Sequence, residues 1–328
     1  MKKRLLVIWM IVVALMVGCQ SSASPDVKTE NQAAVEQEVS TEKDAESTKI
    51  EFVDNMGVTI KLEKPAEKII SLYSVHTENL FALGLDDEII GVSTSDKYPE
   101  DVNEKTKYTY KDDPEVIIAA QPDLVLVRDM IANKYPEYIQ SLRDAGITVA
   151  TLYVKTYDEF DEYMKTLGLL SGKEKEAEEL LKEFHGEIDT IKAKVADQTP
   201  RKAYFESIGK KFKTATPESF AGTALQILNL ENIAADVEHD GKSTVETYGE
   251  EQLLARANEI EIYIAQQGVM NRGITLEQIE ARPGYDQIKA VKEGKVFLID
   301  EKLISGATMR YIDGLKQLVS ELYPNLEK

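Results

Sequence analysis

Residues 173–195 read KEKEAEELLKEFHGEIDTIKAKV, a highly charged segment in which apolar residues recur at intervals of three and four. The apolar positions are Ala177, Leu180, Leu181, Phe184, Ile188 and Ile191. This spacing places them on one face of an α-helix and the charges on the other. Acidic residues come early and Lys192 and Lys194 come late, which matches the helix dipole. We therefore expect one long helix that ends before Thr199-Pro200.

The sequence before this helix alternates short apolar strands with helices. A hairpin is expected first, over residues 50–53 and 58–62, because Asp54-Asn55-Met56-Gly57 between them is typical of a turn. The expected strands cover residues 69–72, 89–92, 123–127 and 147–152, and the expected helices cover residues 77–83, 114–120 and 135–145. Alternation of this kind predicts a parallel sheet with helices on both faces.

The same alternation resumes after the long helix. Strands are expected over residues 202–206, 260–265 and 296–299, and helices over residues 223–228, 250–256 and 311–322. The predicted fold class is therefore α/β, with two Rossmann-like lobes bridged by a single long α-helix. The predicted boundaries are an N-terminal lobe at 49–169, a connecting helix at 170–198 and a C-terminal lobe at 199–328.

The first 48 residues differ from the rest in composition. Lys2, Lys3 and Arg4 precede a thirteen-residue apolar run, too short to span a bilayer and typical of a signal peptide. The run leads into Leu15-Met16-Val17-Gly18-Cys19, which resembles a bacterial lipobox. We expect residues 1–19 to be a lipoprotein signal peptide with Cys19 as the lipidated residue; the alternative is a secretory peptide with an incidental Cys. Residues 20–48 lack Leu, Ile, Phe and Tyr, so we expect a disordered stalk.

Composition excludes several function classes. The chain of 328 residues has 58 Asp and Glu against 39 Lys and Arg, a formal charge of −19. Such a charge would be repelled by a phosphate backbone, so nucleic acid is not an expected partner. With one Cys there is no internal disulfide and no Cys-based zinc site. The sequence also shows no nucleophile motif, no H-E-x-x-H and no Gly-rich phosphate loop, so we expect a binding protein rather than an enzyme.

Several short motifs in order resemble the ABC-transporter substrate-binding lipoproteins that capture iron–siderophore complexes, haem or cobalamin. They lie at residues 65–72 with 77–84, 114–117 with 121–126, 228–232, 250–255, 290–296 and 311–315. Asn229 departs from the pattern, because Gly is usual at that position. The resemblance implies two α/β lobes joined by one rigid helix, a ligand cleft between the lobes, and partnership with an ABC permease and its ATPase. It also implies a monomer held by a lipid anchor on the extracytoplasmic face of the cell membrane.

The resemblance implies a docking role for two glutamates. In the family, one exposed Glu on each lobe binds Arg pockets on the permease, and Glu115 and Glu251 occupy the matching places. Both stand at the start of an expected helix, where the helix dipole favours an anion. Two like charges at a fixed separation would define the orientation of the docked protein.

The ligand cleft is expected at loops that follow the carboxyl ends of the strands. The candidate ligand-binding residues are Tyr73, His76, Tyr108, Tyr110, Arg128, Tyr135, Arg272 and Arg310. Cations that gather at a cleft in an acidic protein suit an anionic ligand, and tyrosines supply stacking and hydrogen bonds. The first expectation is therefore a small-molecule iron complex, a ferric siderophore, with no resident cofactor and no metal site of the protein's own.

Haem and cobalamin remain alternatives. Tyr135 falls where one haem-binding branch of the family places its first iron ligand, and His76 could also serve, but Gln267 stands in place of the second-lobe His of that branch. Cobalamin binders use aromatic residues including Trp, whereas Trp9 lies in the leader. Two further classes stay open: a surface adhesion or interaction lipoprotein with the same fold, and a binder of free metal ions, which the count of three His disfavours.

Overall fold

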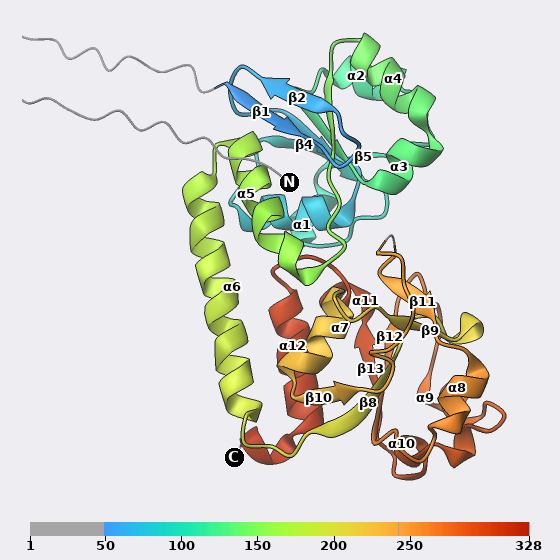
Figure 1. The fold of residues 1–328 in the computed structure, drawn as a ribbon. Coiled ribbons are helices and arrows are strands. Elements are labelled where there is room, and N and C mark those ends of the chain that lie inside the picture. The colour runs from blue at the N-terminus through green and yellow to red at the C-terminus, as the bar shows by residue number, and fades with distance from the viewer. Residues whose placement is uncertain (1–48, 242, 328) are drawn as a thin grey trace, which may run out of the picture. The chain divides into compact units, whose positions relative to one another are not determined.

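The computed structural model describes residues 49–241 and 243–327. One parallel sheet with its helices precedes a long helix in the sequence, and a second parallel sheet with its helices follows it (Figure 1). That helix is α6 (Glu174–Val195), within the range expected from its apolar period. The expected α/β fold class is confirmed. The expected signal peptide, Cys19 and the expected stalk lie outside the described residues.

The N-terminal lobe is built on a five-stranded parallel sheet of order β5-β4-β3-β6-β7. Its strands are β3 (Ile69–Ser71), β4 (Ile89–Ser93), β5 (Thr106–Tyr108), β6 (Leu124–Val127) and β7 (Thr148–Thr151). The sheet is buried on both faces, because Ile69 and Ile70 belong to different hydrophobic clusters and neither side chain is exposed. Helices cover those faces as α1 (Ser74–Ala82), α2 (Glu115–Ala120), α3 (Asp129–Lys134), α4 (Pro136–Asp144) and α5 (Phe160–Ser171).

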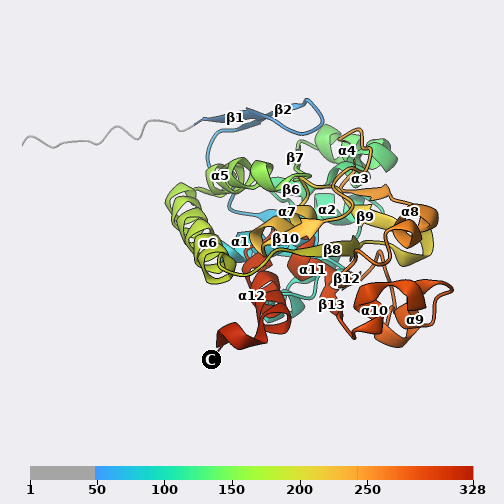
Figure 2. The ribbon, with the colours of Figure 1, turned by 60° about the horizontal axis from the view of Figure 1, so that its bottom comes forward.

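An antiparallel hairpin precedes this sheet, formed by β1 (Ile50–Val53) and β2 (Thr59–Leu62). Figure 2 shows it beside β7, and hydrogen bonds from Thr151 and Tyr153 join the end of β7 to the hairpin turn. Ile50 and Ile60 are each 3% exposed and belong to the main core cluster. The hairpin is therefore a fixed part of the lobe.

The C-terminal lobe has a four-stranded parallel sheet of order β10-β8-β12-β13. Its strands are β8 (Arg201–Glu206), β10 (Leu230–Asn232), β12 (Ile262–Gln267) and β13 (Val296–Asp300). The helices are α7 (Phe220–Ile227), α8 (Glu250–Ala255), α9 (Leu276–Glu280), α10 (Lys289–Lys292), α11 (Glu301–Ile304) and α12 (Tyr311–Leu322). A separate two-stranded antiparallel sheet consists of β9 (Lys213–Ala215) and β11 (Val245–Thr247), with α7 and β10 between them in the chain. Five 3-10 turns complete the described chain: η1 (Glu100–Asn103), η2 (Tyr157–Glu159), η3 (Gly209–Lys211), η4 (Tyr285–Gln287) and η5 (Pro324–Glu327).

Five aromatic side chains, here called the aromatic junction, pack where α6 meets both lobes. They are Tyr157, Phe160, Phe184, Phe220 and Tyr311. The ring of Phe184 on α6 lies 4.8 Å from that of Phe160 on α5 and 6.1 Å from that of Tyr311 on α12. The Tyr311 hydroxyl donates to the Phe220 carbonyl at 2.8 Å, so the only polar atom of that buried side chain is satisfied. The junction therefore ties each lobe to the same stretch of α6.

Phe184→Ala is expected to lower the free energy of unfolding by about 3–5 kcal/mol, because it removes a fully buried ring and leaves a cavity between the two lobes. Urea unfolding followed by circular dichroism measures the change. Glu183→Ala is the matched control, since Glu183 is exposed on the same helix turn and should stay within about 0.5 kcal/mol of the parent. A loss below about 1 kcal/mol for Phe184→Ala would contradict a stabilising role for the junction.

Candidate functional site

A cavity of about 640 Å³ is lined by loops from both lobes. In the N-terminal lobe these loops follow the carboxyl ends of β3, β4, β6 and β7, and in the C-terminal lobe they follow β9, β12 and β13. This is the location at which open α/β sheets bind ligands. The cleft is thus where the topology predicts it.

Arg128, Tyr73 and Tyr153 form an arginine–tyrosine cluster in the wall of this cavity. The guanidinium carbon of Arg128 lies 4.8 Å from the centroid of each tyrosine ring. Its closest acid among residues 49–241 and 243–327 is Asp129, with Nε 3.5 Å from Oδ1. No other polar partner of this guanidinium is found in the described chain, so its terminal N–H donors can serve a ligand. The adjacent rings favour the cation through their π faces.

Burial keeps the tyrosines of the cluster neutral. It raises the pKa of Tyr73 and of Tyr153, although the positive charge of Arg128 opposes the rise in both. Both rings therefore offer a neutral hydroxyl and an aromatic face to a ligand, and neither is a ready tyrosinate.

His76 is one of the residues that line the cavity, although its side chain has no exposed surface. Its Nδ1 is 2.8 Å from the Tyr163 hydroxyl and its Nε2 is 3.4 Å from the Val127 carbonyl. Since a carbonyl can only accept, Nε2 carries the proton and Nδ1 accepts from Tyr163. Burial lowers the pKa of His76 to about 4, so the ring is neutral at physiological pH. Both nitrogens are engaged in the fold, which does not suit the expected role as an iron ligand.

Of the three remaining tyrosine candidates, Tyr108, Tyr110 and Tyr135, only Tyr110 lines the cavity. Tyr110 lines the cavity, and the ring of Tyr135 packs against it at 4.9 Å without lining the cavity itself. Tyr108 is 7% exposed and belongs to a core cluster on the sheet, where its ring covers Gly91 so closely that a Cβ there would lie 2.3 Å from it. Tyr108 is thus a core residue, because the last position of β5 points it into the packing between sheet and helices.

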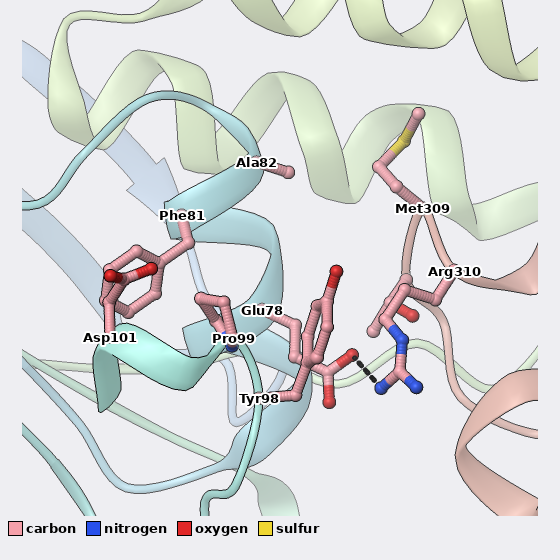
Figure 3. A pocket seen from close by; sticks show the side chains of 9 residues that line it. Glu78, Phe81, Ala82, Tyr98, Pro99, Asp101, Met309 and Arg310 are labelled. Carbon is pink, nitrogen blue, oxygen red and sulfur yellow. Dashed lines mark hydrogen bonds and ion pairs between the residues drawn. The ribbon is translucent and has the colours of Figure 1, made fainter. Parts of the chain in front are cut away.

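The other two arginine candidates also lie outside the cavity. Arg272 is exposed on the loop after β12. Arg310 belongs to a separate pocket of about 270 Å³, shown in Figure 3, where its Nη1 is 3.4 Å from Glu78 Oε2 and its guanidinium lies 3.9 Å from the centroid of the Tyr98 ring. Burial raises the pKa of Glu78 and Arg310 opposes that rise. This pair joins the two lobes, as does the hydrogen bond of 2.8 Å from Asn79 Nδ2 to the Ala307 carbonyl.

The sequence did not single out several residues that line the cavity. Tyr153 completes the cluster around Arg128, and Gln266, Met270, Glu301 and Lys302 supply the facing wall. Glu301 accepts from the Met270 backbone N–H at 2.9 Å. Acidic Asp129 and Glu301 lie among the basic residues, so the lining is mixed in charge.

Glu115 and Glu251 are both exposed, in the first turns of α2 and α8. Within the described residues neither carboxylate has an ion-pair partner. Both helices lie on the side of the molecule away from α6 in Figure 1. Their charges are therefore accessible to a partner.

Acid stability tests the placement of His76. The folded pKa of about 4 is below the ordinary value of 6.5, so His76 contributes stability that is present above pH 6.5 and is lost as the pH falls toward 4. The linkage amounts to about 3 kcal/mol across that window. Urea unfolding between pH 4 and 7 should show a smaller loss in His76→Gln than in the parent. Parallel pH profiles for the two proteins would contradict a buried, neutral His76.

Two other kinds of feature are absent from the part of the chain that the structure describes. No helix in it is long and apolar enough to cross a membrane. No group of three or more His, Cys, Asp or Glu side chains in it is placed to hold a metal ion.

Comparison with known proteins identifies the family. The sequence profile of the periplasmic binding protein family matches residues 69–303. The chain is 30% identical over 285 residues to the uncharacterized ABC transporter substrate-binding lipoprotein YvrC of Bacillus subtilis strain 168, covering 85% of this chain and 86% of the relative. It is 23% identical over 260 residues to the vitamin B12-binding protein of Vibrio cholerae, covering 79% and 90%.

A solved structure agrees with this assignment. The crystal structure of a possible iron-binding, periplasmic solute-binding protein from Staphylococcus epidermidis superposes with a TM-score of 0.70 at 30% identity, covering 79% of this chain and all of that one. These relatives bind solutes for transport, so the expectation of a non-enzymatic protein is confirmed. The chain belongs to the periplasmic binding protein family and is an ABC-transporter substrate-binding protein.

Proposed function

We propose that this protein captures a ferric siderophore complex in the cleft between its lobes and delivers it to an ABC permease and its ATPase. In this proposal Cys19 carries a lipid anchor that holds the protein on the extracytoplasmic face of the membrane. The observation that carries the ligand class is the arginine–tyrosine cluster, a partly exposed cation with free terminal donors between aromatic faces in the cavity wall.

The chemistry of a ferric tricatecholate fits this cluster. Such a complex carries net negative charge, flat rings and iron-bound oxygens at its surface. Arg128 can donate to those oxygens, and Tyr73 and Tyr153 can stack on the rings. Support also comes from the Staphylococcus epidermidis relative, which is described as a possible iron-binding protein.

Haem fits the cavity less well. His76 is fully buried with both nitrogens hydrogen-bonded, and Tyr135 packs behind Tyr110. Burial raises the pKa of Tyr73, which disfavours the tyrosinate that would ligate iron. Cobalamin is the second candidate, because the lining is mixed in charge and the Vibrio cholerae relative is named for vitamin B12.

Parallel calorimetric titrations with a ferric tricatecholate, a ferric hydroxamate, haemin and cobalamin test the ligand class. The tricatecholate is expected to bind best, and Arg128→Ala should weaken it at least about tenfold through the lost charged hydrogen bonds. Arg272→Ala is the matched control, since that arginine lies outside the cavity and should leave the affinity unchanged. If cobalamin binds tightly and none of the iron chelates binds, the siderophore proposal is wrong and cobalamin, the second candidate, replaces it.

The docking role of Glu115 and Glu251 is tested by uptake. Glu115→Ala combined with Glu251→Ala should abolish uptake of the bound chelate by cells carrying the cognate permease, while the affinity for the chelate stays unchanged. Glu137→Ala combined with Glu277→Ala is the matched control, because these are exposed first-turn glutamates of other helices in the same lobes. Normal uptake by the first double variant, or a large loss of ligand affinity in it, counts against the docking assignment.

A further inference from the structure

The turn of the β1–β2 hairpin is built around a buried carboxylate. Asp54 Oδ1 accepts from the backbone N–H groups of Met56 and Val58, each at 2.9 Å, and Oδ2 accepts from Thr151 N–H at 3.0 Å. The Asp54 side chain has no exposed surface. Three backbone donors on one carboxylate fix the turn, and Ile50 and Ile60 fix the strands beneath it. The turn is therefore a rigid support.

The next residue, Asn55, connects this rigid turn to the wall of the cleft through hydrogen bonds. Asn55 N–H donates to the Thr151 carbonyl at 3.0 Å, and Asn55 Oδ1 accepts from Tyr153 N–H at 2.9 Å. Strand β7 ends at Thr151 and lies at the edge of its sheet, so Tyr153 has no neighbouring strand to hold its backbone. The hydrogen bond from Tyr153 to Asn55 takes the place of that strand.

We propose that Asn55 is a positioning residue for ligand binding: it fixes the backbone of Tyr153 so that the tyrosine ring packs against Arg128 and presents the guanidinium to the cavity. The inference rests on the proposed function for its biological meaning, because it assigns Arg128 to ligand recognition. Asn55 itself lies outside the cavity lining, and its effect is transmitted through one backbone hydrogen bond. A hairpin that precedes the lobe's sheet thereby contributes to the binding site.

Phenylglyoxal, which modifies exposed guanidinium groups, tests this without any ligand. Loss of the hydrogen bond in Asn55→Ala should let the Tyr153 ring move and raise the modification rate of Arg128 about fivefold, as measured by peptide mass spectrometry. Amide exchange at Tyr153 should accelerate in the same variant. Asn55→Asp keeps the accepting oxygen and should restore both values, and Met56→Ala, at an exposed side chain of the same turn, should change neither.

A double-mutant cycle separates positioning from general loosening. In a Tyr153→Ala background, Asn55→Ala should add nothing to the modification rate of Arg128, because the ring through which it acts is gone. The affinity for a ferric tricatecholate should follow the same pattern, falling about fivefold when Asn55→Ala is made in the parent and no further when it is added to Tyr153→Ala. A parental modification rate in Asn55→Ala, or an undiminished effect in the Tyr153→Ala background, overturns the inference. If the parent fails to bind the tricatecholate, the proposed function falls, and the modification rates alone decide the role of Asn55.

Discussion

The aromatic junction is the constraint on which the relation of the two lobes depends. Phe184 packs between Phe160 of one lobe and Tyr311 of the other, and all three rings are fully buried. Rings at this packing density cannot slide without opening a cavity, so the base of the cleft resists large hinge motion. The hydrogen bond from Asn79 to Ala307 and the ion pair of Glu78 with Arg310 join the lobes at two more points. Under the proposed function, we therefore expect ligand exchange to depend on a docked permease rather than on a wide closure of the lobes.

The fixed packing of the two lobes also explains why the polar groups near the cleft have different roles. His76 and Tyr163 hydrogen-bond to each other within the cavity wall and stay neutral, because charging either buried ring would require burying an ion. Arg128 lies on the same wall but is partly exposed, and its nearest acid is 3.5 Å from Nε, so its remaining donors face the cavity. Some residues of the cavity wall thus support the fold, and others can contact a ligand.

The period of three and four predicted α6 almost to the residue. Strand alternation predicted every strand of the two parallel sheets except the three-residue edge strands β5 and β10, because burial on two faces leaves a strong sequence signal in the longer or inner strands. Helix α5 was not predicted, although Thr156 and Glu159 form a capping box before it that could have revealed it. The site was predicted less completely. Tyr108 was expected in the cleft, but β5 has only three residues and its last side chain turns into the core. Tyr153 was missed because its role depends on contacts with Asn55 and Arg128, which are distant in sequence.

Burial decides what each charge does in this acidic chain. Glu78 is buried at the lobe interface and is paired, since an unpaired carboxylate there would be costly. Arg310, the arginine of that pair, was expected to bind the ligand. Its positive charge is compensated by Glu78, which makes it unsuited to that role. Arg128 pairs with Asp129 through Nε alone, at 3.5 Å, and keeps its terminal donors for an anion. Glu115 and Glu251 are exposed and keep their hydration. Arg128 is enclosed by tyrosines in the cavity wall, whereas Glu115 and Glu251 stand on two outer helices. Solvent and salt screen these glutamates from the cavity. Ligand recognition and permease docking can therefore use charges of opposite sign on one molecule.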